Sequence, residues 1–233
     1  MRRLRSRDLA CSEKYSLPKF ELDEGLEENR WLESRRARLG KSMALVLCMG
    51  LIVSFTLVLS FTIGFWAAIP PGWDTYAHMT KIQFLLQFWP YSRWGFFWAL
   101  GSPIFRWYPP LVYYLIAGTV VITRFSAAFS LTLWVLLSMI ITSLLIFLTT
   151  RKTGGDYFSS LIASLIPVGS TIYWEWGGGV GMIPRTIAFT PLALYFYLLV
   201  RALTSYANRG AFKRFDIALL VCALSLTTVA HPL

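Results

Sequence analysis

Acidic residues are almost confined to the first 41 positions of this 233-residue chain. That segment holds 8 of the 12 Asp and Glu residues and 11 of the 22 Lys and Arg residues. Only four acidic residues follow it: Asp74, Asp156, Glu175 and Asp216. Charged residues make up 15% of the chain, against about 25% in an ordinary soluble domain. Because so few charges cannot solvate the surface of a soluble protein of this size, the sequence excludes a water-soluble enzyme and predicts an integral membrane protein.

Long apolar runs predict an all-α polytopic fold of about five transmembrane spans. The first run, residues 43–69, has 27 residues without a charge, more than the roughly 20 that cross a bilayer. Further spans are expected at residues 125–150, 157–173 with a kink at Pro167, 186–200, and from about residue 217. Residues 1–42 are expected to form a charged cytoplasmic tail, helical over 21–38, and residues 43–233 the transmembrane domain. Since the chain ends at His231-Pro232-Leu233, inside an apolar run, we expect an N-terminal fragment.

One apolar segment, residues 111–123, is short for a span and could instead lie in the interface or re-enter the membrane. If it does not cross, the segments on the inner side hold 17 of the 22 Lys and Arg residues; if it crosses, they hold 13. The positive-inside rule therefore favours a segment that does not cross, with the N-terminus in the cytoplasm. This choice places residues 70–124, residues 174–185 and His231 together on the outer face.

The first outer loop, residues 70–124, contains an unusual density of aromatic and ionisable residues. Between positions 72 and 108, 13 of 37 residues are aromatic, which suits either a belt in the headgroup region or a groove for a lipid-linked substrate. Asp74 is placed to cap a helix over residues 75–89, on which Asp74, His78 and Lys81 share one face at i, i+4 and i+7. That face could bind a metal-pyrophosphate, take a proton from an acceptor, or face water.

Two arginines, Arg93 and Arg106, follow in the same loop. Their guanidinium groups suit either the phosphate of a substrate or the headgroups of lipids.

Glu175 lies between two tryptophans in the second outer loop, before a glycine-rich run at 177–181. This loop is either a flexible connector or a substrate loop that brings Glu175 to Asp74 as a second carboxylate.

These features together resemble the GT-C superfamily of polytopic glycosyltransferases. The shared pattern is an acidic residue just past a long apolar anchor, an amphipathic helix, and the sequence Tyr108-Pro109-Pro110-Leu111. The superfamily includes protein mannosyltransferases, aminoarabinose transferases and oligosaccharyltransferases. A poorly characterised prokaryotic branch is most similar, with Asp-x-x-x-His, here Asp74 and His78, followed by Gly-x-Pro-x-Phe, here residues 101–105. The resemblance covers roughly residues 43–205 and implies sugar transfer from a polyprenyl-phosphate or diphosphate carrier at the outer face.

The expected reaction assigns roles to individual residues, of which Arg185 is a candidate by the resemblance. Asp74 would act as the general base toward the acceptor hydroxyl or position it, with His78 as the second catalytic residue. The residues expected to bind substrate are Lys81, Arg93, Arg106, Glu175, Arg185 and His231, with Arg185, Arg93 and His78 balancing the charge of the carrier phosphate. Superfamily members with a clear metal site carry two acids in this loop, whereas Thr75 and Tyr76 follow Asp74 here. The motif therefore does not require a divalent metal, for which Asp74 and His78 would be the ligands.

The expected partners are a lipid-linked sugar donor and membrane lipids. The net charge of +10 indicates membrane topology rather than nucleic-acid binding, because the basic residues lie between apolar runs. The cofactor and the oligomeric state are left open. The main rival function is a transporter or flippase-like protein for lipid-linked sugars, which predicts ionisable residues inside the spans, where the sequence has none. A second rival is an inactive N-terminal fragment of a transferase.

Overall fold

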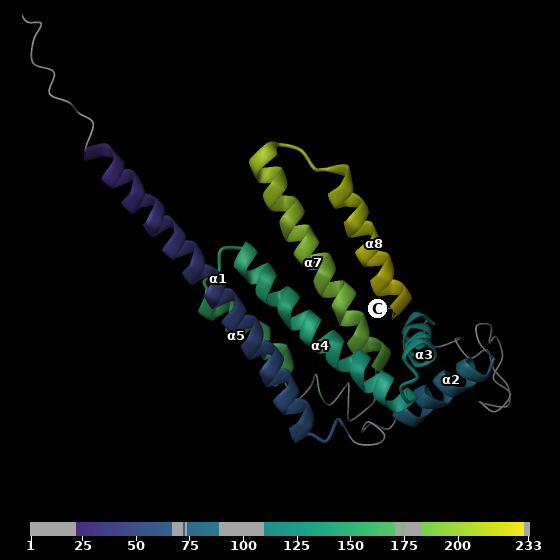
Figure 1. Ribbon diagram of the computed structural model, residues 1–233. Helices are drawn as coiled ribbons and strands as arrows, with labels where there is room; N and C mark the ends of the chain where they lie inside the picture. The colour runs from purple at the N-terminus through teal and green to yellow at the C-terminus, as the bar shows by residue number, and fades with distance from the viewer. Residues whose placement is uncertain are drawn as a thin grey trace, which may run out of the picture. The chain divides into compact units, whose positions relative to one another are not determined.

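A computed structural model describes residues 22–66, 72, 74–88, 110–170, 174 and 183–230 of the chain. Within these residues all regular structure is α-helical, which confirms the predicted all-α class. The chain divides into two compact units, residues 1–44 and residues 45–233. The helices, shown in Figure 1, are α1 (Leu22–Thr62), α2 (Thr75–Gln87), α3 (Leu111–Thr123), α4 (Ala127–Lys152), α5 (Tyr157–Gly169), α7 (Ile183–Arg209) and α8 (Arg214–Ala230).

Three of the described helices are long and apolar enough to cross a membrane: Glu33–Thr62 within α1, α4 and α7. They correspond to three of the five predicted spans. Helices α3 and α5 are apolar but have only 13 residues each, and α8 has 17. The predicted tail helix and the predicted first span form one continuous helix, α1, because the single Gly40 between them costs about 1 kcal/mol and does not stop a helix.

Helices α4 and α7 run side by side (Figure 1), and hydroxyl groups join them. A hydrogen bond of 3.1 Å links the hydroxyls of Thr142 and Thr190, and the Thr190 hydroxyl also lies 3.1 Å from the Ser138 carbonyl, to which it donates. Small hydroxylated residues let two helices approach closely without leaving polar atoms unsatisfied in an apolar surrounding. Helix α8 packs on the other side of α7, and Arg201 of α7 lies 3.7 Å from the Asp216 carboxylate of α8.

The N-termini of α4 and α5 are fixed by side-chain caps. Ser126 precedes α4 with an extended backbone, and its hydroxyl accepts the Phe129 N–H at 3.1 Å. Asp156 precedes α5 in the same way, and its carboxylate accepts the N–H of Ser159 at 2.7 Å and its hydroxyl at 2.8 Å. The hydrogen bond from the Ser159 N–H lowers the pKa of the Asp156 carboxyl. Asp156 thus has a structural role.

The main apolar core joins α2 and α3 to the first halves of α4 and α7. Ile82 and Leu85 of α2 are fully buried beside Ile116 and Ala117 of α3. The same core contains Leu131, Val135, Leu136 and Met139 of α4 and Ile183, Ile187 and Ala188 of α7. Burial of apolar area at about 25 cal/mol per Å² is what fixes α2, a helix too short to span a membrane, against the bundle.

The turn between α4 and α5 has no room for a side chain at Gly155. A Cβ atom there would lie 2.9 Å from both the carbonyl oxygen and the Cγ2 of Thr150. We expect Gly155→Ala to lower the free energy of unfolding by about 1–3 kcal/mol because the backbone must shift. Gly50→Ala is the matched control, since nothing lies within 4 Å of that site in α1. Thermal unfolding in detergent measures both, and an equal melting temperature for the two variants would contradict the tight turn.

Candidate functional site

One face of α2 carries the predicted ionisable residues, and it faces the protein interior. His78 is 1% exposed and Lys81 is 7% exposed, in the same row as the buried Thr75. His78 and Lys81 therefore lie on the same face of α2, as predicted from their spacing. The interpretation in which this face meets water is wrong. The reason is that α3 packs over it and removes it from solvent.

Asp74 occupies the N-cap position of α2, but its side chain makes no capping hydrogen bond. The predicted side-chain cap is therefore wrong. An N-cap side chain reaches the N–H groups of the first turn from an extended backbone, whereas Asp74 has φ −82° and ψ −6°, in the helical region. Ser126 and Asp156, which do cap their helices, have extended backbones. The half-buried Asp74 carboxylate is thus not used to start the helix.

Tyr113 of α3 contacts the buried face of α2. Its hydroxyl lies 2.7 Å from Nδ1 of His78, and the tautomer of the imidazole decides which of the two donates. Tyr113 is 1% exposed. Tyr113 was not among the predicted site residues. The available signal was a tyrosine in an apolar helix, since a buried phenol needs a hydrogen-bond partner.

Lys81 completes a cluster with His78 and Tyr113. Its Nζ lies 5.6 Å from the centroid of the Tyr113 ring, within the range of a cation–π interaction. Burial lowers the pKa of Lys81 to about 8, while the charge of Asp74 acts in the opposite direction. Lys81 is therefore mostly protonated at neutral pH and loses its charge under mildly alkaline conditions, next to the Asp74 carboxylate that favours the charged form.

Arg185 lies in the first turn of α7 and is half-buried. Two residues earlier, Ile183 belongs to the same apolar core as Tyr113 and Ile82. The structure therefore brings the start of α7 to the core that carries the buried face of α2. The other predicted site residues, Arg93, Arg106, Glu175 and His231, lie outside the described residues. The approach of Glu175 to Asp74 stays a prediction.

The described residues contain no group of three or more His, Cys, Asp and Glu side chains that could hold a metal ion. Asp74 and His78 would supply one carboxylate and one imidazole, fewer protein ligands than a zinc or calcium site has. Magnesium is held by one or two carboxylates together with substrate phosphates, a set to which Asp74 could contribute.

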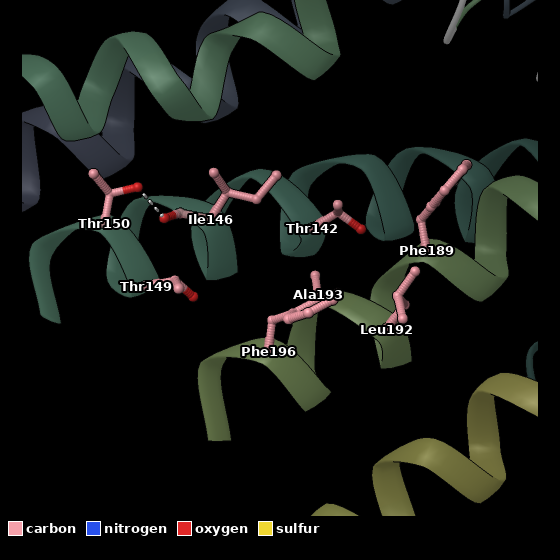
Figure 2. Close-up of a pocket in the computed structure, with 8 residues that line it drawn as sticks. All are labelled: Thr142, Ile146, Thr149, Thr150, Phe189, Leu192, Ala193 and Phe196. Carbon is pink, nitrogen blue, oxygen red and sulfur yellow. Dashed lines mark hydrogen bonds between the residues drawn. The ribbon is translucent and has the colours of Figure 1, made fainter. Parts of the chain in front are cut away.

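A separate groove lies between α4 and α7, with a volume of about 320 Å³. Figure 2 shows its lining, which comes from one face of each helix: Thr142, Ile146, Thr149, Thr150, Phe189, Leu192, Ala193 and Phe196. Apart from three threonine hydroxyls, these side chains are hydrocarbon. The groove is therefore suited to an apolar occupant.

The contact between Tyr113 and His78 can be tested without knowing the function. We expect Tyr113→Phe to lower the free energy of unfolding by about 1–3 kcal/mol, because it removes the hydroxyl that pairs with a buried imidazole nitrogen. Tyr76→Phe is the matched control, since Tyr76 lies on α2 with 64% of its surface exposed. Thermal unfolding in detergent compares the two. A Tyr113→Phe protein as stable as the Tyr76→Phe protein would show that the 2.7 Å contact contributes nothing.

The chain belongs to the family DUF6541, described as a family of unknown function, whose sequence profile matches residues 2–233. Neither a curated protein nor a solved structure matches the chain significantly.

Proposed function

We propose that this protein is a GT-C-like membrane glycosyltransferase that moves a sugar from a polyprenyl-phosphate carrier to an acceptor at the outer face of a prokaryotic plasma membrane. The observation that carries the proposal is the buried cluster of His78, Lys81 and Tyr113, with Asp74 at the start of the same helix. In a chain with so few charges, a carboxylate, an imidazole and an amine gathered on one buried helix face indicate a site for polar chemistry.

The proposed reaction assigns a proton acceptor and a set of cations. Asp74 accepts the proton of the acceptor hydroxyl as its oxygen attacks the anomeric carbon. The bond from that carbon to the phosphate oxygen breaks, and the phosphate leaves with the electron pair, so attack from the opposite side inverts the anomeric centre. Lys81 and Arg185 balance the charge of the leaving phosphate, and Tyr113 orients His78 beside them. Burial strengthens each of these electrostatic interactions relative to water.

The distribution of basic residues supports an outer location for this site. Arg151 and Lys152 lie in the last turn of α4 and Arg209 in the last turn of α7. The cluster of α2 and α3 packs on the opposite, N-terminal halves of α4 and α7. By the positive-inside rule the basic end faces the cytoplasm. In the proposed topology of about five spans, the N-terminus is then cytoplasmic, and the cluster of Asp74, His78 and Lys81 lies on the outer side of the membrane.

The direct test uses membranes that contain the full-length protein and a radiolabelled sugar on polyprenyl phosphate. The proposal expects the label to move from the lipid fraction to an acceptor fraction, and membranes without the protein are the control. Binding of the donor with no transfer to any acceptor would contradict the proposal and favour a transporter of lipid-linked sugars.

A further inference from the structure

The hydrogen bond between His78 and Tyr113 has a direction that decides what His78 can do. Nδ1 of His78 lies 2.7 Å from the Tyr113 hydroxyl, and both side chains are 1% exposed. A neutral imidazole carries its proton on one nitrogen, so one nitrogen donates and the other accepts. If the tyrosine donates, the proton of His78 is on Nε2. If the tyrosine accepts, the proton is on Nδ1, and Nε2 keeps a lone pair for a proton or a metal ion.

The length of this bond favours the hydroxyl as the donor. N–H groups donate to oxygen at about 2.9–3.0 Å in most proteins, whereas bonds donated by hydroxyl groups are shorter, at about 2.7–2.8 Å. The distance of 2.7 Å between Nδ1 of His78 and the Tyr113 oxygen matches the second class. The geometry therefore favours Tyr113 as the donor and Nδ1 as the acceptor.

The ammonium group of Lys81 favours the same direction. Its Nζ lies 5.6 Å from the centroid of the Tyr113 ring. A positive charge there stabilises the negative charge that builds up on the phenol oxygen as its proton is shared, so Tyr113 becomes a stronger donor and a weaker acceptor. Lys81 is also a neighbour of His78 at i+3 on the helix face. Because a protonated imidazole would bring a second positive charge into this buried cluster, His78 is expected to be neutral.

We propose that Tyr113 holds His78 as the neutral tautomer with its proton on Nε2, and that His78 is a hydrogen-bond donor rather than a base or a metal ligand. The donor role in sugar transfer rests on the proposed function. An Nε2–H group stabilises an oxygen that gains negative charge during transfer, and it has no lone pair that could take a proton. Within this cluster, Asp74 is then the group that accepts the proton. Tyr113 acts through His78 and is a positioning residue.

Nuclear magnetic resonance of the imidazole nitrogens tests the tautomer without any substrate. The full-length protein in membranes is labelled with nitrogen-15 histidine and measured at neutral pH. The chain has two histidines, so the His231→Gln protein assigns the remaining signals to His78. A protonated nitrogen is recognised by its bonded hydrogen, and couplings to the ring hydrogens distinguish Nε2 from Nδ1. We expect a protonated Nε2 and a bare Nδ1. A bare Nε2, or protonation of both nitrogens, would overturn the inference.

The role of Tyr113 is tested by Tyr113→Phe in the same experiment. Loss of the hydroxyl removes the preference for one nitrogen, so the signals of both tautomers should appear. Tyr76→Phe, at an exposed position of α2, is the matched control and keeps the native spectrum. An unchanged spectrum in Tyr113→Phe would reject Tyr113 as the group that sets the tautomer. A second readout needs no substitution, since magnetisation should pass between the Tyr113 hydroxyl hydrogen and Nδ1 in the native protein, and its absence would also reject this role.

Two substitutions of His78 distinguish a donor from a base. The amide of His78→Gln offers an oxygen to the Tyr113 hydroxyl and an N–H group for the substrate, but it cannot take a proton. We expect His78→Gln to keep most of the transfer. His78→Leu has neither group and should lose transfer by about 10- to 100-fold, the effect of one hydrogen bond to a charged oxygen. Equal losses in the two variants would reject the donor role. The expected spectrum in a native protein without transfer would reject the proposed function and the donor role, while the tautomer would stand.

Discussion

Replacement of Asp74 by asparagine is expected to lower sugar transfer by about 10²- to 10⁴-fold, the usual contribution of a general base. The amide keeps the shape of the side chain but cannot accept the proton of the acceptor hydroxyl. Helix α2 is expected to remain folded, because the Asp74 side chain makes no capping hydrogen bond that the substitution could break. The ratio of the two transfer rates, native protein to Asp74→Asn, is measured as movement of label from the lipid to the acceptor fraction at equal protein amounts.

The matched control for this experiment is Asp156→Asn. Asp156 is also an aspartate before an apolar helix, and its carboxylate caps that helix through Ser159. Asparagine caps helices about as well as aspartate, so both stability and transfer should stay native. If Asp74→Asn transfers sugar as fast as Asp156→Asn, Asp74 has no role in the proton transfer, and the proposed mechanism is wrong.

Removal of the Lys81 charge is expected to give the second large effect. Lys81→Met should lower transfer by about 10- to 100-fold, because one charge-assisted interaction with the phosphate contributes about 1.5–3 kcal/mol. In the native protein the pKa of Lys81 is lowered to about 8 by burial. Transfer should therefore fall about tenfold per pH unit above 8, as the protonated amine is titrated. The rate of transfer between pH 6.5 and 10 measures both effects.

Folding stability does not produce this alkaline loss. The pKa of Lys81 is lower in the folded protein than its ordinary value of 10.5, so between about pH 8 and 10.5 the unfolded chain binds more protons. The contribution of Lys81 to the free energy of unfolding thus rises with pH in that window. Lys81→Arg is the control that keeps the charge across the whole range, because arginine stays protonated. A Lys81→Arg protein that shows the same alkaline loss as the native one would assign the titration to another group.

The spacing of Asp74, His78 and Lys81 along the chain was enough to predict that they share one helix face. Helical periodicity is local, and α2 forms within two residues of the predicted end. The direction of that face was not predictable from spacing, because it depends on α3, whose Tyr113 is 35 residues from His78 along the chain. Contacts between residues so far apart in the sequence are set by tertiary packing, which a local sequence pattern does not predict.

The capping role predicted for Asp74 shows a second limit of the sequence. Aspartate before a helix is a strong capping signal, and it is correct for Asp156. At Asp74 the backbone takes a helical rather than an extended conformation, which the residue type does not reveal. The groove between α4 and α7 was unpredictable for a similar reason, since it exists only where two helices lie side by side.

The fate of the carrier lipid distinguishes sugar transfer from transport of the intact lipid-linked sugar. The full-length protein is placed in sealed vesicles whose outer leaflet carries the radiolabelled polyprenyl-phosphate sugar and whose medium supplies acceptor. We expect free polyprenyl phosphate to appear one for one with glycosylated acceptor, on the side that Asp74 faces. Sugar that reaches the opposite leaflet still joined to its carrier, with no free carrier released, would contradict the proposed transferase and identify a transporter.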